Sequence, residues 1–109
     1  MDERERRLAK NEALFRDLNE RIEQVAIQQA EDAHVFEFLC ECSKIDCTLR
    51  MNLTLAAYEH ARHDPASFIV ATGHELPEIE EVVFRGDGYQ VVRKHGEAAE
   101  LAEERDPRS

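Results

Sequence analysis

Three cysteines, Cys40, Cys42 and Cys47, lie in the segment FLCECSKIDC, and the chain contains no others. Cysteine thiolates are soft ligands that bind zinc at sulfur–metal distances of about 2.3 Å. Cys40 and Cys42 are two residues apart in an alternating segment, so both side chains should leave one face of a strand, and a turn would then return Cys47 toward them. An odd number of cysteines cannot form a closed set of disulfides. The spacing therefore predicts a metal site.

A tetrahedral structural zinc site needs a fourth ligand, and we expect it to be His74. This histidine follows the apolar segment FIVAT, and Gly73 before it allows the chain to bend. If that segment is a strand beside the first one, its end brings His74 to the edge of the sheet that carries the cysteines. The weaker candidates are Asp46, His34, His60, His63 and His95.

Other chemistries of this cluster stay open at the sequence level. Free cysteines are commonly buried, so three packed thiols without a metal are one alternative. An iron–sulfur cluster is another, although the spacing C-x-C-x4-C matches no standard run. A redox-active thiol is a third, in which Lys44 favours a thiolate while Glu41 and Asp46 oppose it.

A catalytic zinc would keep one open position for water, with Glu75 beside His74 as a general base. The sequence, however, contains no H-E-x-x-H, no Gly-rich phosphate loop and no G-x-S-x-G. A non-enzymatic role is therefore the preferred interpretation.

The elements that must position this cluster begin with a long helix. Residues 3–32 contain no Gly or Pro and many strong helix formers. One seam alternates steps of three and four residues through Leu8, Asn11, Phe15, Leu18, Ile22, Val25 and Gln29. Such a stripe either covers the chain's own sheet or pairs with another helix, in a helical hairpin or a coiled-coil homodimer.

Residues 33–95 are predicted to form a small α+β domain. A strand is expected in the alternating HVFEFLCEC, and a second in SFIVAT. Between them lies a short helix in LTLAAYEHARHDP, capped by Thr54. EEVVFRGDGYQVVRK predicts a β-hairpin with its turn at Gly86–Gly88. Three or four mostly antiparallel strands make a thin core, and domains of this size commonly need a staple such as a metal.

The remaining composition limits the class of partner. The acidic residues 96–109 predict a frayed tail or a marginal extra helical turn. The net charge of −10 argues against nucleic acid, because affinity for duplexes comes mainly from Lys and Arg. No run of about 18 apolar residues predicts a membrane span, and the charged N-terminal segment is not a secretory signal. We therefore expect a cytoplasmic protein.

The chain resembles a set of small bacterial proteins that share F-x-C-E-C, a third cysteine nearby, L-T-x-x-x-Y, G-H-E and a final Y-x-V-V. Here these motifs are FLCECSKIDC, LTLAAYEHAR, DPASFIVATGHE and YQVVRK, within roughly residues 11–94. The resemblance supports the domain boundaries and the choice of Cys40, Cys42, Cys47 and His74. It implies no particular activity, substrate or cofactor.

Taken together, the sequence predicts a zinc-stapled protein-interaction or regulatory module. Its partner would be another protein or a second copy, bound through the N-terminal helix. The alternative is a thiol-based redox sensor or a metalloenzyme that uses the same cluster. A third interpretation is a regulator that acts through the helix alone, with inert thiols.

Overall fold

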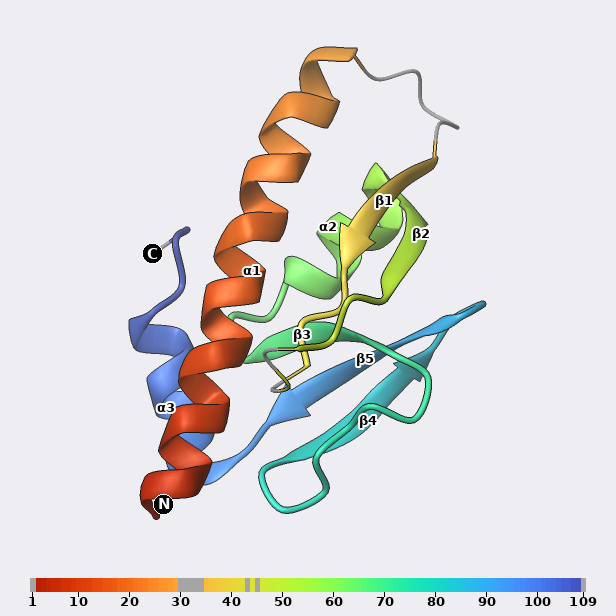
Figure 1. Cartoon of the computed structure of the whole chain (residues 1–109). Helices are drawn as coiled ribbons and strands as arrows, with labels where there is room; N and C mark the ends of the chain where they lie inside the picture. Colours follow the sequence, from red (N-terminus) through yellow and green to blue (C-terminus); the bar gives the residue numbers. More distant parts are fainter. Residues whose placement is uncertain (1, 30–34, 43, 45, 109) are drawn as a thin grey trace.

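The computed structural model describes residues 2–29, 35–42, 44 and 46–108. Within these ranges a long helix is followed by two small antiparallel sheets and two short helices, which confirms the predicted α+β class (Figure 1). The elements are α1 (Glu3–Gln29), β1 (Val35–Leu39), β2 (Arg50–Thr54), α2 (Leu55–Arg62), β3 (Ser67–Ala71), β4 (Glu80–Arg85), β5 (Tyr89–Lys94) and α3 (Gly96–Glu104). Residues 30–32 of the predicted helix, and His34, lie outside the described residues.

The strands form two sheets in place of the single sheet that we expected. β1 pairs with β2, and the second sheet has the order β3–β5–β4. We did not predict β2, because its last residue, Thr54, is also the N-cap residue that predicts the start of the following helix. The predicted cap is confirmed: the Thr54 hydroxyl accepts a hydrogen bond of 3.1 Å from the backbone N–H of Ala57.

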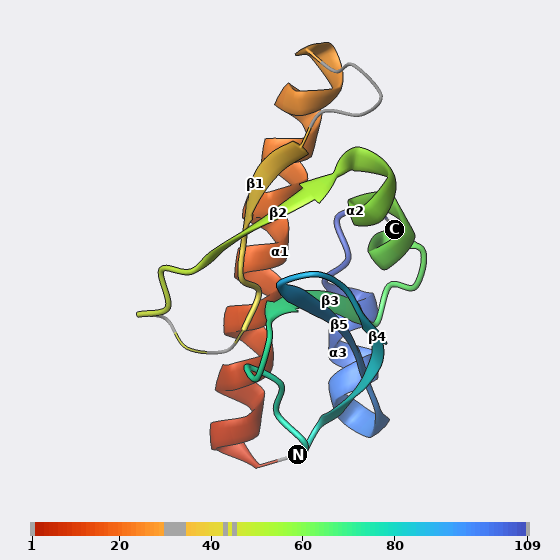
Figure 2. The ribbon, with the colours of Figure 1, turned by 90° about the vertical axis from the view of Figure 1, so that its right-hand side faces the viewer.

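Glu41, which follows β1, connects the two sheets. Its backbone N–H donates to the carbonyl oxygen of Ile69 on β3, and its carboxylate accepts from the N–H of the same residue, both at 2.8 Å. Just before it, the N–H of Cys40 still bonds to the Leu49 carbonyl oxygen, at 3.1 Å. The chain after β1 therefore lies between the segment that leads into β2 and the outer edge of β3. In Figure 2 the two sheets lie together in front of α1.

The face of α1 that packs against the body is not the predicted apolar seam. Its buried residues are Ala9, Glu12, Ala13, Arg16, Asn19, Glu20, Glu23 and Ala26. Of the seam, Leu8, Asn11, Phe15 and Ile22 are only partly buried. Leu18 keeps 37% of its surface and Val25 keeps 59%. The side chain of Gln29 is outside the described part. The seam therefore does not simply cover the chain's own sheets, because α1 docks mainly through polar and small side chains.

Specific polar contacts hold this charged face in place. The Lys94 ammonium on β5 donates to side-chain carboxyl oxygens of Glu12 on α1 and Glu80 on β4, and all three side chains are essentially buried. The Arg16 guanidinium donates to the carbonyl oxygens of Pro65 (2.6 Å) and Ala102 (2.7 Å). Buried charges are tolerated when they are paired in this way.

Residues 96–104 form a full helix, where we predicted a frayed tail or a marginal turn. Ala98 and Ala102 are buried on its inner side, where α3 packs against α1 and β5. The chain beyond it is also held, because Arg108 donates hydrogen bonds to Glu20, Glu23 and Glu59. Small alanines give a weak apolar signal, which explains why the sequence did not reveal this packing. The predicted division into segments at residues 32 and 95 stays a prediction.

None of the described helices is long and apolar enough to cross a membrane.

Candidate metal centre

The structure brings the four predicted ligands together. The Sγ atoms of Cys40, Cys42 and Cys47 and a ring nitrogen of His74 all lie within 4.8 Å of one another. The Nδ1 atom of His74 is 3.6 Å from Cys40 Sγ and 3.8 Å from Cys47 Sγ. Cys40 and Cys42 are each 2% exposed. Cys47 and His74 are partly buried, so the cluster is closed on the inside and approachable from one side.

These separations suit a single tetrahedral ion. With sulfur and nitrogen at about 2.3 Å and 2.0–2.1 Å from zinc, tetrahedral angles place two sulfurs about 3.8 Å apart and a sulfur and a nitrogen about 3.6 Å apart. The observed contacts to His74 match these values. An iron–sulfur cluster distributes its ligands over two or more irons and so holds them farther apart than this compact group.

The end of β1 delivers the two buried sulfurs. The backbone N–H of Ala71, the last residue of β3, donates to Cys40 Sγ over 3.1 Å. An N–H group that points at a sulfur stabilises the thiolate form, which is the form that binds a metal. The contacts that join Glu41 to Ile69 fix the chain between Cys40 and Cys42. The sulfurs are therefore held by the junction between the two sheets.

A tight turn after β3 delivers His74. The His74 N–H donates to the Ala71 carbonyl oxygen at 2.9 Å, and Gly73 inside the turn has φ of +87°. Only glycine adopts that conformation readily, which is why Gly73 is needed here. The turn is tied to β5 by the buried side chain of Gln90, whose Oε1 accepts from the Gly73 N–H at 3.3 Å.

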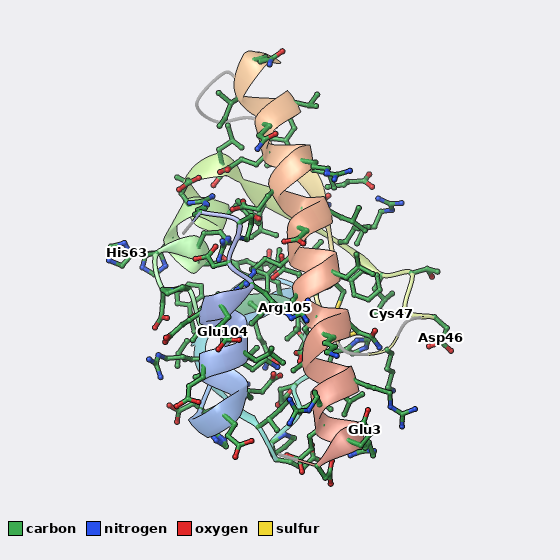
Figure 3. All side chains as sticks on the ribbon, turned by 90° about the vertical axis from the view of Figure 1, so that its left-hand side faces the viewer. Glu3, Asp46, Cys47, His63, Glu104 and Arg105 are labelled. Carbon is green, nitrogen blue, oxygen red and sulfur yellow. The ribbon has the colours of Figure 1, made fainter. Side chains whose placement is uncertain are left out.

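Cys47 lies in the loop that connects β1 to β2. Its N–H donates to the Lys44 carbonyl oxygen at 3.0 Å, which is the predicted return of the chain. Asp46 is exposed and lies at the outer tip of this loop (Figure 3). It is not part of the four-residue group.

The close thiols share their protons unequally. The hydrogen bond from Cys40 is the largest influence on Cys42 and lowers its pKa to about 5, and contacts from His74 and Cys47 act in the same direction. The same bond, together with burial, raises the pKa of Cys40. These contacts favour the thiolate form of Cys42, and the thiolate is the form that binds a metal.

The other sequence candidates lie elsewhere. His60 and His63 are exposed at the end of α2, and His95 is exposed at the start of α3. Glu75, the candidate general base, follows His74 but does not belong to the group.

Glu41 and Gln90 support the site, a role that we did not predict for either residue. Glu41 is fully buried, and burial raises its pKa to about 7, although hydrogen bonds from Asn19 and Ile69 act against this. The signal for Glu41 was available, because a carboxylate between two buried cysteines needs partners. Gln90 gave no signal, since its role depends on which strand lies beside the turn.

No protein-family model, curated protein or solved structure matches this chain, so its function has to be inferred from the geometry of the site.

Proposed function

We propose that the chain is a small zinc-binding module that acts through its surface and not as an enzyme. Cys40, Cys42, Cys47 and His74 hold one ion at the junction of β1, the following loop and β3. The single observation that supports this most directly is the convergence of three sulfurs and one ring nitrogen within 4.8 Å.

The donor set favours zinc. Three thiolates and one imidazole are the ligands of structural zinc sites of the Cys₃His type. Hard cations such as magnesium and calcium prefer oxygen, and the group offers none. The role of the ion is structural. It links the end of β1, the loop that follows it and the turn after β3, which otherwise meet through few hydrogen bonds.

A closed ligand set argues against catalysis. Catalytic zinc sites keep one position open for water or substrate, whereas four protein ligands fill a tetrahedron. In this arrangement His74 and Cys47 occupy the positions that a reacting molecule would need.

The second candidate is a thiol-based redox sensor, and the contact of Cys42 with the other thiols is the feature that favours it. The low pKa of Cys42 is typical of a reactive cysteine. Against this, Cys42 is 2% exposed, and an oxidant would reach Cys47 first.

The test combines elemental analysis with thiol titration on protein purified without added metal. We expect one zinc per chain, and no reaction with a thiol reagent until a chelator removes the ion. Because every cysteine of the chain belongs to the cluster, all three thiols should then react as zinc appears in solution. Protein that contains almost no transition metal, with a cysteine that reacts at once, would contradict the zinc proposal and favour the redox sensor.

A further inference from the structure

The outward face of α1 carries three exposed apolar side chains and two arginines. The residues opposite the buried face are Arg7, Leu14, Leu18, Arg21 and Val25, spaced by three, four or seven positions. Leu14 is 48% exposed, Leu18 37% and Val25 59%, and both arginines are exposed. Large apolar side chains that share one helical face in this way mark an interaction surface when they are contiguous.

A basic group extends this face toward the N-terminal end of the helix. Arg4, Arg6, Arg7 and Lys10 are exposed there and are interleaved with Asp2, Glu3 and Glu5, so residues 2–10 carry a net charge of +1. In a chain with a net charge of −10, such a group is a local reversal of sign. Electrostatic complementarity then predicts an acidic partner surface.

The outward face of α3 is acidic. Glu97, Glu100, Glu103 and Glu104 are exposed on a helix whose inner side is formed by Ala98 and Ala102. Figure 3 looks onto α1 and α3, which lie side by side as one outer layer.

We propose that this layer, the outward faces of α1 and α3, binds a second copy of the chain in a two-fold dimer. In this dimer the basic end of α1 in each copy faces α3 of the other copy. This inference rests on the interaction role proposed above, and it names a second copy of the chain as the partner. We name a second copy as the partner because one molecule carries the basic end of α1 and the acidic face of α3 on the same side. A two-fold axis places the basic end of α1 of each copy against the acidic face of α3 of the other copy, so the contact is made twice.

The size of the layer sets the strength of the dimer. A helix of 27 residues is about 40 Å long, and helices pack about 8–10 Å apart. With the nine residues of α3, the layer offers about 500 Å² per copy, which is below the roughly 800 Å² of a standard interface. We therefore expect a transient dimer that forms at micromolar concentrations and weakens with salt.

The first measurement is sedimentation velocity of the zinc-loaded full chain, from micromolar to hundreds of micromolar. We expect a concentration-dependent shift from monomer to dimer. The shift should weaken when ionic strength rises from about 0.1 M to 1 M, because the screening length falls from about 10 Å to 3 Å. A monomer throughout this range would overturn the proposal.

Charge reversal tests whether α1 faces α3. Arg4→Glu/Arg7→Glu and Glu100→Lys/Glu104→Lys should each reduce self-association at least tenfold. An equimolar mixture of the two variants should restore it, because both contacts of the mixed dimer then pair opposite charges. The control Arg50→Glu/Arg85→Glu makes the same charge change at exposed positions on β2 and β4 and should leave the dimer intact. Failure of the mixture to associate would overturn this arrangement.

Vesicle binding and zinc content complete the test of this layer. If the wild-type chain stays monomeric but binds vesicles that contain anionic phospholipid, the layer is a membrane surface and the dimer proposal is wrong. Zinc content is measured on the same samples. A monomer with one bound zinc contradicts only the dimer, whereas a metal-free dimer contradicts only the zinc centre.

Discussion

His74 is the one ligand of the candidate centre that comes from the β3 side of the junction. Its Nδ1 atom lies close to both Cys40 Sγ and Cys47 Sγ, so in the proposed centre it would be the fourth ligand of the ion. Without the imidazole, three sulfurs and a water molecule would have to hold the ion.

Replacing His74 with alanine should weaken zinc affinity by tenfold or more, since even changes to the partners of a ligand cost roughly 10–100-fold. Competition with a chromophoric chelator measures the affinity. His63→Ala is the matched control, because His63 is exposed on the far side of the molecule from Cys47 (Figure 3) and does not belong to the cluster. Equal affinities for the two variants would remove His74 from the ligand set.

Glu12 is a buried acid outside the candidate centre whose pKa is shifted by its burial. Desolvation raises its pKa well above the ordinary value of 4.5, and the nearby Glu80 carboxylate adds to this, while Lys94 acts in the opposite direction. A raised pKa means that the folded state holds a proton that the unfolded state has released. The contribution of Glu12 to stability is therefore complete below pH 4.5 and declines as pH rises toward the folded pKa.

The variant Glu12→Gln should remove this dependence, because glutamine imitates the protonated acid. Urea unfolding of both proteins at several pH values from about 5 to 9 gives the comparison. The wild-type free energy of unfolding should fall relative to the variant by up to about 1.4 kcal/mol per pH unit. Taking the difference between the two proteins cancels the pH dependence of the metal centre, which they share. Parallel curves would show that Glu12 is ionised in the folded state.

At the scale of elements, the docking of α1 depends on directed hydrogen bonds. The Asn19 side chain accepts from the Leu39 N–H at 2.7 Å and donates to the Leu39 carbonyl oxygen at 2.8 Å, so it pairs with β1 as a further strand residue would. It also donates to Glu41 at 2.8 Å.

Truncating this side chain should be costly. Asn19→Ala leaves the Leu39 backbone groups and the Glu41 carboxylate with fewer partners, and each unsatisfied buried group costs about 1–3 kcal/mol. Gln24→Ala, at an exposed position of the same helix, should stay within about 0.5 kcal/mol of wild type. Denaturant unfolding compares the two variants, and equal stabilities would show that the contacts to Leu39 contribute little.

The sequence predicted the elements better than their faces. Backbone signals such as the Thr54 cap and the alternating HVFEFLCEC act locally, and so they located helices and strands. The buried side of α1 could not be found in this way, because Glu12, Arg16 and Asn19 become suitable for burial only beside Lys94, Pro65 and Leu39, which are distant in sequence. The four ligand candidates were identifiable because cysteine and histidine have few other uses at that spacing. Glu41 could have been identified as a carboxylate between two cysteines that needs partners, but Gln90 could not, because its role depends on strand order.

At the scale of the whole molecule, the metal should supply much of the stability. The candidate metal centre joins segments of both sheets. An ion that binds only the folded state stabilises it by about 4 kcal/mol when its free concentration is a thousand times Kd.

Removing zinc with a chelator should lower Tm by more than about 10 °C, since 1 kcal/mol shifts the Tm of a small domain by several degrees. Cys40→Ser should melt at the lower temperature with or without chelator. Calorimetry provides the readout. A wild-type Tm that does not respond to chelator would show that the thiols pack without an ion.

The charged inner face of α1 also determines when the helix joins the rest of the chain during folding. Lysine, arginine and carboxyl groups lose their hydration when they are buried. Their hydrogen bonds and ion pairs offset this loss of free energy only when each partner is in its final position. We therefore expect hydrophobic collapse to order the sheets first and α1 to dock on them after the rate-limiting barrier. In kinetic terms, Asn19→Ala should speed unfolding and leave the refolding rate nearly unchanged, as stopped-flow measurements in denaturant would show. A slower refolding rate would instead place α1 in the folding nucleus.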